Sequence, residues 1–290
     1  MEIQWALIIF TLFTAFGSGL FAIQGLLALL GKGEKIQLPA LVTAFAAIVV
    51  GGLASFTHLQ HWDRAFNGFG RLTSGITQEL IGIVVVVLCM VVYFVFLRRG
   101  SIPKGIGAVA LVLGVALIVV MTTSYMMPAR PVWTTPLLYL FYLSQGLVAG
   151  GAAAWIIAEA VKEGPAVGLG AKTTAIGGAL VVVALVAYAF YIASVQFTDV
   201  GNYFDPTQPT KPMTDISSYL TLLVSGSLAP QFWSAVVVGG MVPAAAGIIR
   251  WKKEGGGLAF AAVALVAALA GGLAFRFAIY VLGGSVFIFY

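Results

Sequence analysis

Charge is scarce in this sequence. Lys and Arg contribute 15 residues and Asp and Glu contribute 10, so that charged residues make up 9% of a 290-residue chain. Ordinary soluble domains carry about a quarter of their residues as charged ones. Hydrophobic residues account for 61% of the chain, which leaves too little polar surface for a water-soluble fold. The composition therefore excludes a soluble enzyme, a disordered protein and a protein that binds nucleic acid.

Cysteine and histidine are almost absent as well. Cys89 is the one cysteine, so the chain cannot by itself form a disulfide, a zinc site or an iron–sulfur cluster, and we expect this residue to pack as an apolar one. The two histidines, His58 and His61, lie three residues apart on one short segment. Two histidine ligands to a haem would have to face each other across a helix bundle. We therefore expect no haem; a haem with one histidine and an axial methionine stays as the alternative.

Long apolar runs dominate what is present. A membrane-spanning helix needs about 20 apolar residues. Eight runs meet this length, near 5–30, 38–57, 75–97, 105–127, 135–158, 173–196, 231–249 and 258–283. The first run is too long for a signal peptide and is preceded by Glu2 rather than by a basic residue, so we predict that it is retained. The sequence predicts an all-α integral membrane protein, with residues 1–290 forming a single eight-helix transmembrane domain.

The basic residues predict the orientation of these helices. Ten Lys and Arg residues follow spans 1, 3, 5 and 7, and four lie in the connections on the other side. Because Lys and Arg are enriched in cytoplasmic loops, both termini are expected on the extracytoplasmic side of the cell (inner, cytoplasmic) membrane. Five tryptophans would then form an aromatic belt at the helix ends: Trp5, Trp62, Trp133, Trp233 and Trp251.

Two further features concern packing and connections. Gly146 and Gly150 form a GxxxG pair, which we expect to serve close packing inside the bundle. The longest connection, at about 197–230, is predicted to be an extracytoplasmic loop. Within it, residues 216–224 are predicted to form a short interfacial helix.

Ionisable residues at membrane depth are the informative ones in so apolar a chain. At 1.5 Å per helical residue, four polar side chains fall in one layer beneath the extracytoplasmic surface: His58, Glu79, Tyr125 and Arg276. An unpaired charge facing hydrocarbon is costly, so His58 and Glu79 at their helix ends require a partner or a function. Arg276 either extends to the surface or lines a pocket.

These residue types suit the oxidation of a quinol. Neutral histidine and carboxylate groups accept protons, and a lipid-soluble quinol releases two protons when it gives up its electrons. Phe66, with Phe69 and Trp62, would provide an aromatic wall for the ring. We therefore predict a quinol pocket in which His58 and Glu79 act in catalysis. The predicted quinol-binding residues are His58, Arg64, Phe66, Glu79, Tyr125 and Arg276.

Three further polar residues of this segment have other interpretations. Arg64 holds a carboxylate or contacts a lipid headgroup. His61 and Asp63 are interpreted as parts of an ordinary polar loop at the headgroups.

At these residues the chain resembles the membrane anchor subunit of the dimethyl sulfoxide reductase complex, an eight-helix family. The family pattern is roughly His-Leu-Gly-x-Pro-x-Arg-Ala-Phe-Asn, followed by an Arg, a Ser and a Glu. The matching residues are His58, Leu59, Arg64, Ala65, Phe66, Asn67, Arg71, Ser74 and Glu79. Gln60 and Trp62 replace the family's Gly and Pro, and the interval from His to Glu is one residue shorter. A second similar stretch runs from Tyr125 to Pro131 and includes Trp133 and Pro136.

The resemblance implies a role in anaerobic respiration. In this family the anchor binds menaquinol, a four-cluster iron–sulfur subunit takes the electrons, and a molybdopterin catalytic subunit reduces a small oxidised substrate. The family residue matching His58 is needed for quinol binding, and the one matching Glu79 contributes. We expect both partner subunits on the extracytoplasmic face, with lipid around the helices and the quinol protons released outside. The chain would carry the quinol oxidation site but not the site that reduces the terminal substrate.

Other interpretations stay open. A polysulfide-reductase-type quinone-binding anchor is a neighbouring possibility. A small-solute transporter would place ionisable residues at the midplane and show clearer internal repeats. A purely structural anchor would bind no quinone.

Overall fold

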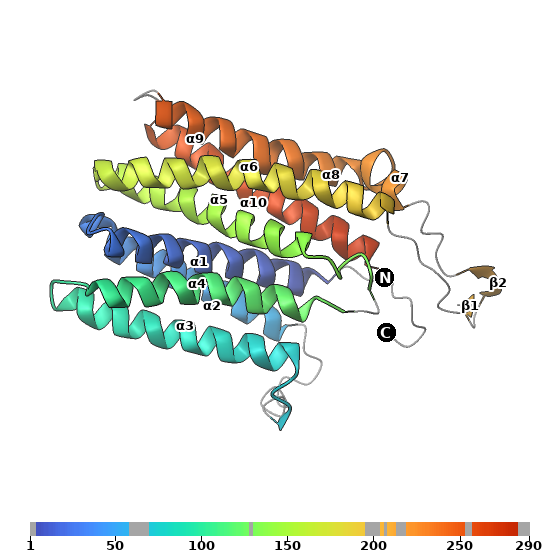
Figure 1. Ribbon diagram of the computed structural model, residues 1–290, viewed down its shortest axis with the longest axis horizontal. Helices are drawn as coiled ribbons and strands as arrows, with labels where there is room; N and C mark the ends of the chain where they lie inside the picture. The colour runs from blue at the N-terminus through green and yellow to red at the C-terminus, as the bar shows by residue number, and fades with distance from the viewer. Residues whose placement is uncertain are drawn as a thin grey trace.

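The computed structural model describes residues 4–57, 70–127, 130–194, 204–205, 208–212, 219–252 and 257–283. Within these ranges eight helical stretches are long and apolar enough to cross a membrane, as the sequence predicts. They lie side by side in one bundle (Figure 1). The helices that build the spans are α1 (Trp5–Leu29), α2 (Gln37–Phe56), α3 (Gly75–Arg98), α4 (Lys104–Ser124), α5 (Leu137–Ala160), α6 (Gly164–Ser194), α8 (Ala229–Val236), α9 (Val242–Lys252) and α10 (Gly257–Leu282).

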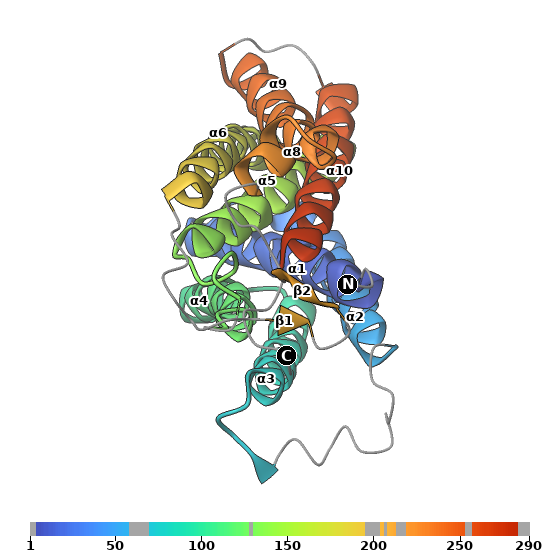
Figure 2. The ribbon, with the colours of Figure 1, turned by 90° about the vertical axis from the view of Figure 1, so that its right-hand side faces the viewer.

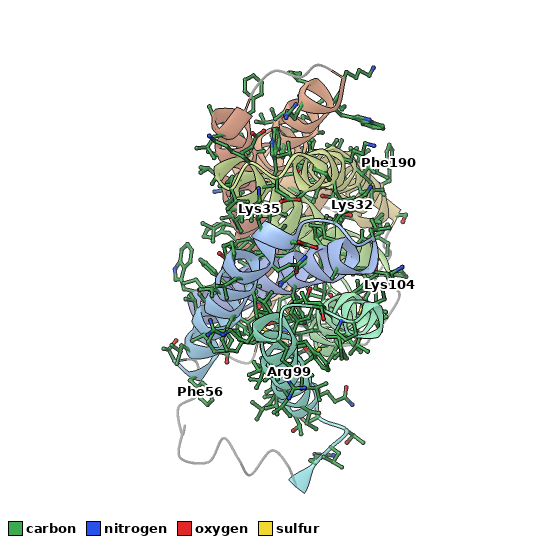
Figure 3. The ribbon with its side chains drawn as sticks, turned by 90° about the vertical axis from the view of Figure 1, so that its left-hand side faces the viewer. Lys32, Lys35, Phe56, Arg99, Lys104 and Phe190 are labelled. Carbon is green, nitrogen blue, oxygen red and sulfur yellow. The ribbon has the colours of Figure 1, made fainter. Side chains whose placement is uncertain are left out.

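The bundle has two chemically different ends. We call the end where α1 begins and α10 finishes the terminal end; it lies on the right in Figure 1. We call the opposite end the basic end, because the connections there carry most of the lysines and arginines. Figure 3 looks onto the basic end, with Lys32, Lys35, Arg99 and Lys104 labelled. That the basic end faces the cytoplasm stays a prediction from the charge distribution.

Helices α1 and α5 form the centre of the bundle and cross at glycines. A Cβ atom on Gly19 would lie 2.0 Å from the carbonyl oxygen of Gly146, and one on Gly150 would lie 2.5 Å from the carbonyl carbon of Gly19. The backbones can approach this closely only because no side chain intervenes. The predicted use of the GxxxG pair in packing inside the bundle is thereby confirmed.

The other helices surround this centre. Helices α2 and α4 pack on α1, and α6 and α10 pack on α5. Helix α3 lies at the rim, at the lower edge of Figure 1, and packs mainly on α4. Most of its side chains are exposed or half-buried and would face lipid. Cys89 is half-buried and packs against the apolar core, as expected.

Helix α6 begins at Gly164, whereas the sequence predicted a start at 173. The earlier start is possible because Pro165 occupies the first turn, where its missing N–H is not needed. Gly170 then lets α6 approach α5: a Cβ atom there would lie 2.7 Å from the backbone nitrogen of Trp155. Lys172, inside the helix, lies 5.4 Å from the ring of Trp251.

The seventh span is interrupted rather than continuous. Between α8 and α9 lies a π-helical turn, η4 (Val237–Met241). Its Gly239 faces α10, and a Cβ atom added to Gly239 would lie 2.8 Å from the Cα of Gly271. A π-helical turn of this kind widens the helix locally and is often found near functional sites.

Among the described residues, the connections add a short helix, a strand hairpin and a 3-10 helix. A short helix was predicted at 216–224, and helix α7 (Tyr219–Val224) confirms it for residues 219–224. Residues 216–218 lie outside the described residues. Strands β1 (Phe204–Asp205) and β2 (Gln208–Pro212) form an antiparallel hairpin in the long connection and are an exception to the all-α prediction. In this hairpin Phe204 pairs with Pro212 and Asp205 pairs with Gln208. A short 3-10 helix, η1 (Glu34–Ile36), precedes α2.

Candidate functional site

Glu79 is buried at the start of α3. The side chain is 8% exposed, and its carboxylate accepts a hydrogen bond from the Ser124 hydroxyl at the end of α4. Gly75 makes this contact between the helices possible, because a Cβ atom there would lie 2.7 Å from the Cβ of Ser124. The carboxylate is therefore turned away from the hydrocarbon and held between two helices.

Tyr125 follows Ser124 and belongs to a group of three aromatic rings. Its ring centroid lies 5.9 Å from that of Trp133 and 6.2 Å from that of Tyr280, and the latter two are 5.2 Å apart. All three pairs meet edge to face, an arrangement that aromatic rings favour. The Tyr125 hydroxyl is a neutral hydrogen-bond donor at neutral pH, as tyrosine hydroxyls ordinarily are. Tyr125 thus connects the end of α4 with the end of α10.

The prediction that Trp133 lies in the aromatic belt is wrong. The side chain is 4% exposed, and its ring nitrogen donates a hydrogen bond of 2.8 Å to the carbonyl oxygen of Ile279. Trp133 is buried because the connection between α4 and α5 folds against the end of α10. Trp5 and Trp233 are about half exposed, as a belt requires, and Trp62 lies outside the described residues.

Arg130 strengthens this contact between the α4–α5 connection and α10. Its guanidinium donates to the carbonyl oxygen of Gly283 at 2.8 Å and lies 4.5 Å above the Trp133 ring. Burial lowers the pKa of Arg130 from its usual value. A cation at this position also interacts favourably with the carboxyl-terminal end of α10.

Arg276 lies in the interior and does not extend to the surface. It is 0% exposed, and its Nε donates to the Thr11 hydroxyl at 3.0 Å. Its Nη2 contacts the Thr11 carbonyl oxygen at 3.2 Å and the Gln145 side-chain oxygen at 3.4 Å, and its Nη1 donates to the Gly272 carbonyl oxygen at 3.0 Å. The guanidinium also lies 4.8 Å from the ring centroid of Tyr142. One cation therefore joins α1, α5 and α10.

These contacts form one buried polar layer at the terminal end. Tyr280 lies one turn beyond Arg276 on α10 and contacts Tyr125, which is adjacent to the Ser124 that binds Glu79. We call this set the polar layer: Thr11, Glu79, Ser124, Tyr125, Trp133, Tyr142, Gln145, Arg276 and Tyr280. The structure thus brings together three of the predicted site residues. His58, Arg64 and Phe66, together with His61, Asp63 and Phe69, lie outside the described residues.

Several members of the polar layer escaped the sequence analysis. Gln145 is a strong polar group in the middle of an apolar span, and this signal was available from the sequence. Tyr142 and Tyr280 gave no signal, because tyrosine is common at membrane interfaces. Their hydroxyl groups and the side-chain nitrogen of Gln145 are buried without a partner in hydrogen-bonding geometry among the described residues. Buried polar groups usually have partners, and water or a ligand could complete the hydrogen bonding of these three atoms.

The polar layer combines groups of different chemistry within a few helical turns. Glu79 is a proton acceptor, Arg276 is a fixed cation, and the tyrosines and Gln145 are neutral donors. Aromatic rings surround them. Such an arrangement can bind a molecule with polar hydroxyl groups on an apolar ring and can accept a proton from it.

Fold and layer together define a multi-pass helical membrane protein with ionisable groups buried near one membrane face. The family model of the DMSO reductase anchor subunit (DmsC) matches residues 1–202. The chain belongs to this family, which confirms the resemblance inferred from the 58–79 segment. It is therefore a membrane anchor of a DMSO-reductase-type complex and associates with the other subunits of such a complex. No curated protein matches the sequence.

The match covers α1 to α6 and therefore includes Glu79, Tyr125 and Gln145. Arg276 and Tyr280 lie beyond it, on α10. Their place in the layer follows from the contacts in the structure alone.

Proposed function

We propose that this anchor subunit oxidises a quinol at the polar layer and passes the electrons to an iron–sulfur partner subunit. The quinol would be menaquinol, as in the family, and the process would serve anaerobic respiration. Membership of the family supports the role of membrane anchor. The proposal adds the reaction and its location.

The burial of the Glu79 carboxylate carries this proposal. Oxidation of a quinol releases two electrons and two protons, so the site needs a proton acceptor at membrane depth. Glu79 is such a group, held by Ser124 and adjacent to the Tyr125 ring system. His58, which lies outside the described residues, would be the second acceptor.

The remaining groups suit binding. The hydroxyls of Tyr142 and Tyr280 and the side-chain nitrogen of Gln145 would hold the two oxygens of the quinol, since no partner among the described residues meets them in hydrogen-bonding geometry. Arg276 would favour negative charge on the ligand as a proton leaves. Arg64 and Phe66, in the segment not described, would contribute a further cation and an aromatic wall.

The electrons would leave through a partner, because a chain with one cysteine cannot hold an iron–sulfur cluster. A four-cluster iron–sulfur subunit would dock at the terminal end, close to the polar layer, and a molybdopterin subunit would reduce the terminal substrate. With the terminal end outside, the protons would be released there. Turnover would then add little to the membrane potential.

The test compares two electron donors in the assembled complex. We expect Glu79→Gln and His58→Ala to slow quinol-dependent reduction about a hundredfold or more, because each variant removes a proton acceptor. Reduction driven by an artificial donor, which bypasses the anchor, should stay unchanged. Glu163→Gln, the same substitution at the basic end, is the matched control and should behave as wild type.

Co-purification of the partner subunits with each variant verifies assembly. Quinol-dependent rates equal to wild type in both assembled variants would refute the site. A complex that binds no quinol-analogue inhibitor would instead support a purely structural anchor.

A further inference from the structure

A cavity of about 270 Å³ opens at the basic end, far from the polar layer. It lies between the connection from α1 to α2 and the connection from α3 to α4. Polar groups from both connections line it, including Lys32, Glu34 and Ser101. Gly31 (φ +64°) and Gly100 (φ +89°) shape the turns at its rim with backbone conformations that glycine adopts most easily.

Gln37 forms a fixed polar side of this cavity. It is 2% exposed, and its side-chain oxygen accepts a hydrogen bond of 2.7 Å from the Tyr93 hydroxyl. Its backbone oxygen accepts one of 2.7 Å from the side-chain nitrogen of Gln24. Because the side-chain oxygen is engaged, the amide nitrogen is the group that Gln37 can offer to a ligand, and this group is a donor.

An apolar groove of about 210 Å³ lies between α2 and α3, next to the cavity along these helices. Its lining is Leu41, Val42 and Phe45 from α2 and Met90, Val91 and Phe94 from α3. Leu41 lies one turn beyond Gln37, and Phe94 lies one turn before Leu97, which lines the cavity. The two spaces therefore follow each other along the same pair of helices. Phe45 is eight residues beyond Gln37, so the groove reaches about 12 Å deeper.

The surroundings of the cavity are strongly positive. Between residues 31–35 and 97–104 the chain carries five cations and one anion, a net charge of +4. The cations are Lys32, Lys35, Arg98, Arg99 and Lys104, and all five are exposed. In Figure 3, the labelled members of this group lie on the end of the bundle that faces the viewer. This charge is complementary to a phosphate group.

We propose that the cavity and the groove together bind one anionic phospholipid of the leaflet at the basic end. The headgroup phosphate occupies the cavity next to Lys32 and the Gln37 amide, and one acyl chain lies in the groove between α2 and α3. A polar cavity followed along the same two helices by an apolar groove matches an amphiphile with a short charged head. An isoprenoid quinone has no charge to meet the five cations, so it fits this site less well.

The first test measures which lipid stays bound. The full complex is reconstituted into vesicles of phosphatidylcholine containing phosphatidylglycerol, extracted gently, and examined by native mass spectrometry. We expect one retained phosphatidylglycerol. Lys32→Gln should weaken its retention about fivefold, the factor expected for one cation near an anionic headgroup, and Glu34→Gln should strengthen it. Lys162→Gln makes the same charge change elsewhere at the basic end and should have no effect.

The second test fills the groove. Val91→Phe places a larger side chain between α2 and α3, whereas Val183→Phe makes the same change on α6; both valines are 55% exposed. Only Val91→Phe should release the phospholipid, and both variants should keep quinol-dependent turnover, which verifies folding. Equal retention of phosphatidylcholine and phosphatidylglycerol would overturn the proposal. So would wild-type retention in Lys32→Gln and Val91→Phe, or a quinone in the groove instead of a phospholipid.

Discussion

The two ends of the bundle differ in whether they bury charged side chains. At the basic end, Lys32, Arg99 and their neighbours are exposed, and even the ion pair of Arg250 with Glu159 leaves both side chains more than a fifth exposed. At the terminal end, Arg276 and Glu79 are buried, and each is held by a residue of another helix. Figure 2 views the bundle from the terminal end and shows the ends of α1, α4 and α10, which carry residues of the polar layer.

This difference separates two uses of charge in a membrane protein. A charge at the membrane surface is solvated by water and headgroups, so it costs little and serves orientation and lipid contact. A buried charge costs several kcal/mol unless hydrogen bonds compensate for the lost water. The fold keeps Arg276 and Glu79 buried despite this cost, which is typical of functional sites.

The largest expected difference in stability is between the same arginine substitution made at each of the two ends. Arg276→Gln should lower the free energy of unfolding by about 3 kcal/mol, because acceptors on Thr11 and Gln145 lose a buried donor. Arg250→Gln should lower it by less than about 1 kcal/mol, since its ion pair is partly solvated. Thermal unfolding of the detergent-solubilised complex measures both. Equal losses would show that the two ends do not differ in this way.

A glycine substitution should change stability in opposite directions at the two ends. In Gly272→Ala the new Cβ would lie 2.8 Å from the Gln145 nitrogen and 3.1 Å from Arg276 Nη1, so both side chains must move. We expect a loss of about 1–2 kcal/mol. Gly168→Ala near the basic end meets no atom within 4 Å and should stabilise α6 by about 0.5 kcal/mol. Unfolding curves showing a gain for Gly272→Ala would contradict the packing described for Arg276.

Much of the fold could be predicted from the sequence, because a membrane span is encoded by length and hydrophobicity alone. The boundary of α6 could not: Gly164, Pro165 and Lys172 resemble loop residues until the neighbouring α5 and Trp251 are known. The π-helical turn between α8 and α9 also depends on a neighbour, since Gly239 packs against Gly271.

The polar layer was predictable in depth but not in composition. Counting residues along the spans placed Glu79, Tyr125 and Arg276 at the same level, and their contacts agree with this. The direction in which Tyr142 and Tyr280 point depends on how α5 and α10 are rotated about their axes. The sequence of a span that is apolar on all sides does not predict this rotation. Trp133 was misplaced because the fold of the α4–α5 connection against α10 is a tertiary contact.

The smallest expected effect concerns the two tryptophans that seemed equivalent in sequence. Trp133→Phe removes the buried hydrogen bond to Ile279 and should lower the free energy of unfolding by about 1 kcal/mol. Trp251→Phe should change it by no more than about 0.5 kcal/mol, because Trp251 is 54% exposed and contacts only Lys172 among the described cations. The same unfolding measurement applies, with Trp5→Phe as a control at the terminal end, since Trp5 is 50% exposed. If Trp5→Phe costs as much as Trp133→Phe, stability depends on position along the membrane normal. If it behaves like Trp251→Phe, burial in the polar layer is what distinguishes Trp133.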